Sequence, residues 1–533
     1  MNTQISWSTN MEILRKILNR LILSGAWTIP IAFAMLNFII LPDLIGTNEA
    51  ANSYAISLVI SVLIYLWIST DKMMHPSEKD GLKGKDAALN KRINRKLLSA
   101  DPEGIILGRS GRYYVRKPLD KDGHVLIIGG SGSGKSSCVV IPTLLANPEA
   151  SIFAIDIKGE LSMKSRKYSD PDIRLFDPED RMTYGYDPLF RLRTAPSAQK
   201  VLETMQLISA SLISVPADIK DPFWKISSRN LLTGLLIYFY DQGKTNFIEI
   251  VDEILGRPIR ETVKNVMETA PEHTPEYRYL VQFKDMPDET MGGILAEMNN
   301  HLQIFANDMD IRYAFKENPL KFVPGDLEAG LSIFLSVREH KLTDYYDIFQ
   351  LILNQVLSEL EKRPEDSRPV LFIADELPRI LSAGKLAKLL DSAKTLRSRK
   401  VTLFLIIQSV EALMQAYSEN EAMDLISNCP YLLILSATSG KTQKMVADWC
   451  GKYRQRRKSW SGNGSKTSVS VSYEERNIID PSDLMTLQET GKAVLISPYG
   501  FSMISKAPYY SDRVLAQRSE EIVALNKTLK GAS

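Results

Sequence analysis

The sequence predicts a mixed α/β fold with a mainly parallel sheet, an inserted helical segment and a two-helix N-terminal anchor. Three observations predict it. Short apolar runs alternate with helix-like stretches from about Gly104 onward, residues 195–316 have helical periodicity without a strand-like run, and two long uncharged runs precede residue 71. The chain has 533 residues, and single cores stop growing at about 250–300 residues. We therefore expect several folded units.

The two uncharged runs at the N-terminus, 21–42 and 50–70, are long enough to span a membrane. A helix rises ~1.5 Å per residue and a hydrocarbon core is ~30 Å thick. Lys and Arg flank the pair of runs, whereas the connecting loop 43–49 has neither. The positive-inside rule then places both ends in the cytoplasm. We expect a two-pass anchor over 1–72 and a cytoplasmic linker over 73–103.

Six short apolar runs are candidate buried strands, because they are bounded by polar residues or glycine and lack helical length. They are Val125–Ile128, Ser151–Asp156, Val370–Ala374, Val401–Ile407, Tyr431–Leu435 and Ala493–Ile496. Helix-like stretches separate most of them. Such alternation predicts a parallel sheet with helices on both faces, built from residues 104–194 and 317–533.

The inserted segment, 195–316, is predicted to be an all-α domain. Its helix-like stretches are Ala198–Leu212, Lys225–Tyr240 and Glu289–Phe305.

A phosphate-binding loop follows the first of these strands. Gly129–Ser136 matches G-x-x-x-x-G-K-[ST] at every fixed position and precedes a helix-like stretch, which is the context that the motif requires. Backbone N–H groups of such a loop surround phosphate oxygens, Lys135 can reach the β- and γ-phosphates, and Ser136 can ligate Mg²⁺. We predict a RecA-like P-loop NTPase domain that binds ATP and Mg²⁺. The predicted binding residues are Gly129, Gly130, Ser131, Gly132, Ser133, Gly134, Lys135, Ser136 and Ser137.

Two adjacent carboxylates end the strand Val370–Ala374. Asp375 is predicted to hold Mg²⁺ and Glu376 to act as general base or to position the attacking water. Gln408, which ends the next strand, is a candidate sensor of the γ-phosphate; the alternative is a surface glutamine. Arg397 and Arg399 are candidate arginine fingers for a neighbouring subunit, or simply solvated arginines at a helix end.

Net charge is only +2, so any nucleic-acid contact must come from a local patch. The segment 451–473 has no acidic residue and is predicted to be flexible at Ser461–Ser465. Its cations and aromatics suit single-stranded DNA; the alternative is a mobile, solvated basic loop. Trp224 is a further candidate contact, or a packing residue. Residues 83–96 could instead meet lipid headgroups. The DNA-binding candidates in the basic segment are Arg454, Arg456, Arg457, Lys458 and Trp460.

The order of these elements resembles that of the type IV secretion coupling proteins, the TraG/TraD-like conjugative DNA-transfer ATPases. Besides the phosphate loop and Asp375-Glu376, the similar motifs run in the same order along the chain. They are Asp156-Ile-Lys-Gly-Glu-Leu161, Phe176-Asp-Pro178, Asp187-Pro-Leu189, Pro222-Phe-Trp224, Arg397, Gln408-Ser409 and Asn428-Cys429. Ile157 departs from the family's proline, and Asp187 from its asparagine.

The resemblance implies a homo-hexamer in the bacterial inner membrane, with ATP sites between subunits and a central channel. It also implies that the protein recruits a relaxase or relaxosome bound to single-stranded DNA and delivers it to a type IV secretion channel. In this reading the all-α domain recognises the substrate. The alternatives are a coupling receptor for protein effectors, a translocase of the FtsK type, for which no winged helix follows Pro498, and a membrane scaffold without hydrolysis.

Overall fold

The computed structural model describes residues 93–533 except 181, 216–218, 464–465 and 533. Both predicted membrane spans, 21–42 and 50–70, lie outside the described residues. Within the described part of the chain, no helix is long and apolar enough to cross a membrane. Residues 84–533 form one compact unit, and the fold given below is that of its described residues.

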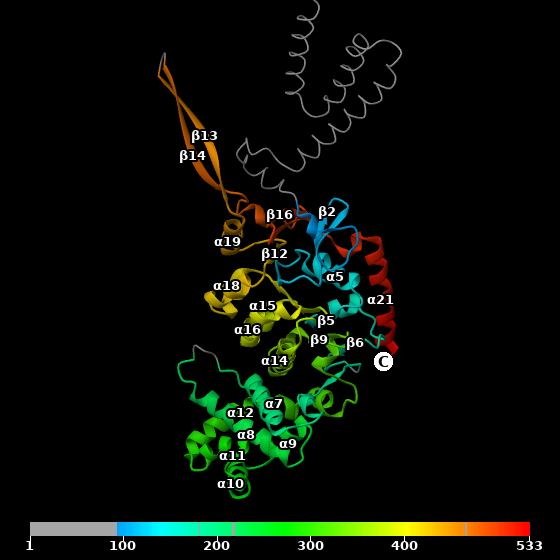
Figure 1. Ribbon diagram of the computed structural model, residues 1–533, viewed down its shortest axis with the longest axis vertical. Coiled ribbons are helices and arrows are strands. Elements are labelled where there is room, and N and C mark those ends of the chain that lie inside the picture. The colour runs from blue at the N-terminus through cyan, green and yellow to red at the C-terminus, as the bar shows by residue number, and fades with distance from the viewer. Residues whose placement is uncertain (1–92, 181, 216–218, 464–465, 533) are drawn as a thin grey trace, which may run out of the picture. The chain divides into compact units, whose positions relative to one another are not determined.

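A twelve-stranded sheet organises the unit, in the order β1-β3-β2-β16-β15-β12-β4-β11-β10-β5-β9-β6 (Figure 1). Neighbours from β12 to β6 in this order pair in parallel, whereas β15, β16, β2, β3 and β1 are added in antiparallel fashion. The strands are β1 (Leu98–Ser99), β2 (Ile105–Ser110), β3 (Tyr113–Lys117), β4 (Val125–Ile128), β5 (Ser151–Asp156), β6 (Ile173–Phe176), β9 (Ser332–Ser336), β10 (Val370–Ala374), β11 (Val401–Ile407), β12 (Tyr431–Ile434), β15 (Lys492–Ser497) and β16 (Gly500–Ser505).

The predicted mixed α/β fold is confirmed, but the sheet differs from the prediction: strands β1, β2 and β3 on its antiparallel side had no prediction. Strands β4, β5, β10 and β11 have the predicted bounds. The predicted run at 493–496 belongs to β15, which pairs antiparallel with β12 and forms a hairpin with β16. Strands β6 and β9 extend the parallel part on the other side and had no prediction.

Apolar side chains of the central strands divide between two cores, one on each face of the sheet. In β4, Leu126 and Ile128 belong to one cluster, and Val125 and Ile127 to the other. This alternation follows from the two-residue period of a strand. The first cluster includes residues of helices α7 (Ala198–Leu212), α8 (Phe223–Asp241), α14 (Tyr346–Lys362) and α16 (Ala387–Thr395). The second includes residues of η2 (Ser136–Val140), α5 (Ile141–Ala146), α6 (Glu160–Ser165) and α21 (Arg513–Ala532).

The helices outside the insertion begin and end at the following residues. They are η1 (Arg95–Leu97), η2 (Ser136–Val140), α5 (Ile141–Ala146), α6 (Glu160–Ser165), η3 (Phe190–Leu192), η6 (Pro324–Leu327), η7 (Glu339–Lys341), α14 (Tyr346–Lys362), α15 (Leu377–Ala383), α16 (Ala387–Thr395), η8 (Leu396–Arg399), α17 (Val410–Ala416), α18 (Glu419–Ser427), α19 (Gly440–Cys450), α20 (Asp483–Thr486), η9 (Tyr509–Ser511) and α21 (Arg513–Ala532).

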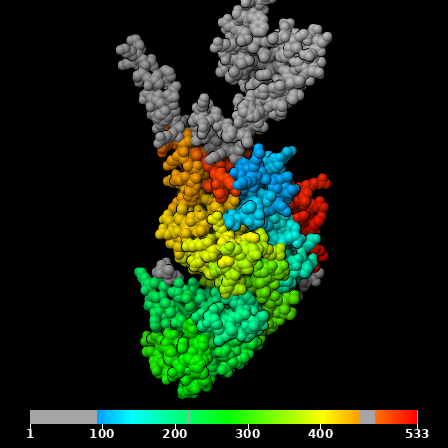
Figure 2. All heavy atoms as spheres, in the orientation of Figure 1, coloured from blue at the N-terminus to red at the C-terminus, as the bar shows by residue number. Residues whose placement is uncertain are grey.

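A helical segment separates β7 (Gly185–Tyr186) from β8 (Lys321–Phe322), which pair in parallel and bring its two ends together. Figure 1 shows this segment beyond the β6 end of the sheet, and Figure 2 shows its atoms, in green, gathered at one end of the unit. Its described residues form no strand. Besides η3, its helices are α7 (Ala198–Leu212), α8 (Phe223–Asp241), α9 (Phe247–Gly256), α10 (Ile259–Thr269), α11 (Pro275–Leu280), η4 (Val281–Phe283), α12 (Asp288–Asn307), α13 (Met309–Arg312) and η5 (Tyr313–Glu317).

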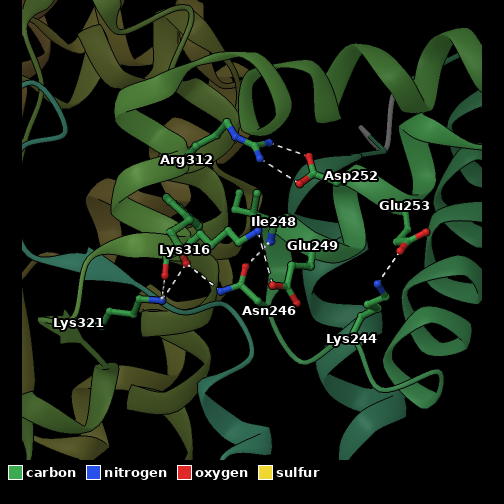
Figure 3. A network of polar contacts seen from close by, with 10 residues as sticks. Lys244, Asn246, Ile248, Glu249, Asp252, Glu253, Arg312, Lys316 and Lys321 are labelled. Atoms are coloured by element: carbon green, nitrogen blue, oxygen red, sulfur yellow. Dashed lines mark hydrogen bonds and ion pairs between the residues drawn. The ribbon is translucent and has the colours of Figure 1, made fainter.

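Polar contacts tie the last part of this segment to α9 (Figure 3). Arg312 donates two hydrogen bonds to Asp252, at 2.7 and 3.0 Å. Lys316 lies 3.5 Å from Glu249, and Lys321 donates to the carbonyl oxygen of Phe315 at 2.9 Å. The chain therefore returns to the sheet along a defined path.

Residues 461–463 of the segment predicted to be flexible belong to a strand, whereas 464–465 lie outside the described residues. Strand β13 (Lys452–Asn463) pairs antiparallel with β14 (Lys466–Asn477) along its whole length, and Figure 1 shows this two-stranded ribbon extending from the body of the unit. The flexibility of Ser461–Ser465 stays a prediction. The alternating Val469 and Val471 favour the observed strand, because a β-branched residue at every second position suits a pleated backbone.

Candidate nucleotide-binding site

The predicted phosphate loop joins the carboxyl end of β4 to η2. Gly132 and Gly134 have φ angles of 73° and 93°, which L-residues with side chains rarely adopt. A Cβ atom at Gly134 would also lie 2.6 Å from Sγ of Cys138. The loop curls around its own lysine: Lys135 is only 8% exposed and donates to the carbonyl oxygens of Gly129 and Gly130, at 2.9 and 3.0 Å.

Two residues from distant parts of the chain hold this loop. The hydroxyl of Ser436, beyond β12, accepts a hydrogen bond from the Gly130 N–H at 3.1 Å. Lys506, beyond β16, donates to the carbonyl oxygen of Ser133 at 2.8 Å. Neither residue belongs to the loop motif, and no sequence signal singled them out. The antiparallel side of the sheet therefore contributes to the shape of the loop.

Asp156 and Asp375 end the neighbouring strands β5 and β10, and both are buried. Asp156 accepts hydrogen bonds from the backbone N–H groups of Leu161 and Ser162 and from the Ser162 hydroxyl, at 2.8–3.1 Å. Asp156 therefore satisfies backbone N–H groups in the first turn of α6. Asp375 differs, because its Oδ1 has no hydrogen-bond partner among the described residues.

The pKa of the Asp375 carboxyl is raised to about 7, first by burial and then by the nearby negative charges of Asp156 and Glu376. Lys135 and Lys158 oppose this rise. Burial likewise lowers the pKa of the Lys135 ammonium, against the attraction of Asp375 and Glu376. A buried carboxylate oxygen without a partner, beside other carboxylates, is stabilised by a cation. The residues present thus fit Mg²⁺ held by Asp375, with Ser136 in the loop as the predicted second ligand.

Glu376 follows Asp375 in a left-handed backbone conformation, with φ 53° and ψ 46°. Its Oε1 accepts a hydrogen bond from Nζ of Lys158 at 2.8 Å. Its Oε2 lies 3.5 Å from Nε of Arg379 and has no hydrogen-bond partner in the described part of the chain. Lys158, part of the Asp156–Leu161 motif, was not among the predicted site residues.

Gln408 and Arg397 lie at opposite edges of the sheet. Gln408 is exposed and directly follows Ile407, whose carbonyl oxygen accepts the N–H of Gly129 at 3.1 Å. Arg397 is exposed in η8, before β11 begins, and so lies at the amino-terminal edge. The parallel register of β4 and β11 therefore separates Arg397 from the phosphate loop of its own chain. Arg399 donates to the carbonyl oxygen of Arg363 at 3.0 Å.

The DNA-binding candidates belong to two other parts of the unit. Trp224 lies at the start of α8 and is 40% exposed, and its ring contacts Phe223 and closely approaches Gly293 of α12. It is thus partly a packing residue. The candidates between Arg454 and Trp460 all lie on β13. None of these residues belongs to the phosphate loop or to the strand ends around it.

Comparison with known proteins relates the chain to conjugation. Residues 81–531 match the family model described as type IV secretory system conjugative DNA transfer. Protein VirD4 of Agrobacterium fabrum is 24% identical over 416 residues, which cover 74% of this chain and 60% of that protein. The chain thus spans less than two thirds of this curated relative.

Solved structures share the fold. The plasmid coupling protein TrwB in complex with the non-hydrolysable ATP analogue ADPNP has a TM-score of 0.57 and 16% identity, covering 80% of this chain and 92% of that one. The same protein in complex with ADP and Mg²⁺ has a TM-score of 0.56 at 16% identity, covering 78% and 90%.

Proposed function

Because this chain belongs to the conjugative DNA transfer family of type IV secretory systems, we propose that it is an inner-membrane coupling ATPase. It recruits a relaxase–single-stranded DNA complex to a type IV secretion channel and uses ATP hydrolysis to drive transfer. The observation that carries this proposal is the unpartnered Oδ1 of Asp375, beside Glu376 and the buried Lys135 of the phosphate loop.

In this proposal, the loop Gly129–Ser137 binds the phosphates and Lys135 contacts the terminal ones. Glu376 accepts a proton from the attacking water, and Gln408 orients that water. Mg²⁺, held by Asp375 and Ser136, would neutralise charge on the phosphate oxygens. The ADPNP and the ADP with Mg²⁺ named for the TrwB structures support ATP and Mg²⁺ as ligands.

Arg397 acts across a subunit interface in a homo-hexamer, in this proposal. Its position at the amino-terminal edge of β11, away from its own phosphate loop, supports a role toward a neighbouring loop. A guanidinium there stabilises negative charge that develops on the transferred phosphoryl group.

The proposed domain organisation assigns a role to each part of the chain. Residues 1–72 are a two-pass anchor that contacts lipid, with both ends in the cytoplasm, and 73–103 are a linker. Residues 104–194 and 317–533 bind nucleotide, and the all-α domain 195–316 recognises relaxosome proteins. The basic β13–β14 ribbon and Trp224 contact single-stranded DNA, which agrees with the cation-rich sequence of β13.

The test measures ATP turnover by the full-length, detergent-solubilised protein with and without single-stranded DNA. Lys135→Ala is expected to lower turnover at least ~100-fold, because charge stabilisation at the phosphates is lost. Lys441→Ala, at an exposed lysine 3.1 Å from Glu419, is the matched control and keeps turnover. Equal turnover in wild type and Lys135→Ala would refute the ATPase. Stimulation by relaxase or effector protein but not by DNA would favour a receptor for protein substrates.

A further inference from the structure

We propose that Lys158 is the positioning residue for Glu376: its ammonium pins Oε1 and leaves Oε2 to accept the proton of the attacking water. This inference rests on the proposed ATPase function. It concerns how the general base is held.

Lys158 and Glu376 meet because β5 and β10 are parallel neighbours. Ile155 pairs with Ala374, so the chain leaves both strands at the same edge of the sheet. Lys158 extends from the end of β5, and its Nζ lies 2.8 Å from Oε1 of Glu376. The lysine side chain is half exposed, whereas that of Glu376 is 13% exposed. A solvent-facing ammonium therefore holds a mostly buried carboxylate.

The backbone of Glu376 explains why such a restraint is needed. A left-handed conformation is disfavoured for a residue with a side chain, and it persists only where surrounding contacts maintain it. The charge-assisted hydrogen bond from Lys158 is such a contact. With Oε1 occupied, Oε2 is the carboxylate oxygen without a hydrogen-bond partner among the described residues. It is buried, so in this proposal it receives the proton of a water molecule that enters the site with the nucleotide.

Arg379 is the competing candidate for this role, and its geometry is weaker. Its Nε lies 3.5 Å from Oε2, and the same guanidinium also forms an ion pair with Glu339. Arg379 is 44% exposed and comes from α15, directly after Glu376. Its contact therefore does not pin the carboxylate as the Lys158 hydrogen bond does.

The experiment measures kcat and KM for ATP in the full-length protein with Lys158→Met, Lys158→Arg, Glu376→Gln and the double variant Lys158→Met/Glu376→Gln. Lys158→Met is expected to lower kcat ~10- to 100-fold, because a misplaced base loses this much, with KM changed less than twofold. Lys158→Arg recovers most of the loss. The double variant turns over no more slowly than Glu376→Gln, since removing the base leaves nothing to position.

Lys164→Met is the matched control, because Lys164 forms an i,i+4 ion pair with Glu160 at 2.6 Å on the adjoining helix. Its kcat should match wild type. Lys158→Gln, expected between Met and wild type, replaces Lys158→Met if thermal melting shows that the methionine variant is unfolded.

Three results would overturn the positioning role: an unchanged kcat in Lys158→Met, a raised KM at constant kcat, or a double variant in which the losses multiply. In each case wild-type turnover is intact, so only the role of Lys158 fails. Absence of turnover in wild type and in every variant would instead reject the ATPase, and the positioning role with it.

Discussion

Two buried side chains at the amino-terminal edge of the parallel sheet differ in their hydrogen bonds from Asp375 and Glu376 at the carboxyl-terminal edge. At the amino-terminal edge, Lys117 donates to the carbonyl oxygen of Lys121 and to the hydroxyl of Thr402, at 2.5 and 3.0 Å. His124 contacts the carbonyl oxygen of Ala393 through Nε2 at 2.9 Å and accepts the Leu403 N–H on Nδ1 at 3.0 Å. Both side chains are fully buried and hydrogen-bonded.

At the carboxyl-terminal edge, the hydroxyl of Ser133, Oδ1 of Asp375 and Oε2 of Glu376 lack hydrogen-bond partners within the described residues. An unsatisfied buried polar atom costs ~1–3 kcal/mol. Because Asp375 and Glu376 lie beside Lys135 of the phosphate loop, their unpartnered oxygens are candidate contacts of a ligand. We therefore expect substitutions at the first edge to lower stability, and those at the second to lower activity.

The largest effect is expected at Glu376. Glu376→Gln should lower ATP turnover ~10²–10⁴-fold, because an amide cannot accept the proton. Binding of a fluorescent ATP analogue should persist, since the phosphate loop is unchanged. If Glu376→Gln hydrolysed ATP nearly as fast as wild type, the unpartnered Oε2 of Glu376 would have no chemical role. The contrast between the two edges of the sheet would then fail.

The next largest effect is expected at His124. His124→Ala removes two hydrogen bonds from a fully buried site and should lower the free energy of unfolding by ~2–4 kcal/mol, measured by urea denaturation. ATP affinity should stay within twofold.

His124 also predicts a pH dependence of stability. Burial lowers the pKa of His124 to about 4 in the folded protein, whereas the pKa of a histidine in the unfolded chain is ~6.5. Between pH ~6.5 and pH ~4, the unfolded chain therefore binds a proton that the folded protein does not bind. Stability conferred by neutral His124 is complete above pH ~6.5 and is lost as pH falls toward 4. His124→Ala should lack this part of the acid sensitivity, and an identical pH profile would contradict it.

The smallest effect is expected from Asp375→Asn. This substitution should raise the free energy of unfolding, whereas His124→Ala should lower it. Because the folded pKa of Asp375 is raised to about 7, the folded protein holds a proton that the unfolded chain releases above pH ~4. Stability of the nucleotide-free protein should therefore fall as pH rises from ~4 to ~7. Asp375→Asn should remove this fall and raise the free energy of unfolding at pH 8 by ~1–2 kcal/mol.

The measurement is the melting temperature across pH 4–8, with Asn428→Ala at a partly buried loop position as control. Asp375→Asn should also lose the additional stability that MgATP confers on wild type. If the melting temperatures of Asp375→Asn and wild type changed in parallel with pH, the pKa of the Asp375 carboxyl would not be raised in the folded protein.

The central strands and the phosphate loop were predictable because their signals are local. Strands β4, β5, β10 and β11 are short apolar runs ended by glycine, Asp156, Asp375 and Gln408, and burial on both faces requires such runs. The loop requires glycines and a lysine at fixed spacing, so its motif could be identified without a structure.

Pairings between distant residues depended on the tertiary structure. Lys158 and Glu376 are 218 residues apart, and Lys506 and Ser133 are 373 apart. Spacing along the chain carries no information about such contacts, because strand order decides them. The antiparallel pairing of β15 likewise depends on its partner β12, and the ribbon depends on the pairing of β13 with β14.

The sequence by itself determined which residues can bind phosphate and which carboxylates stand beside them, because those properties belong to side-chain chemistry and short spacing. Only the tertiary structure decided which of these carboxylates has an oxygen without a hydrogen-bond partner among the described residues. Asp156 and Asp375 both end apolar strands, yet one is engaged by the N–H groups of α6 and the other has an unpartnered oxygen. Hydrogen bonding in a buried environment, which the fold alone arranges, separates the structural acid from the candidate functional one.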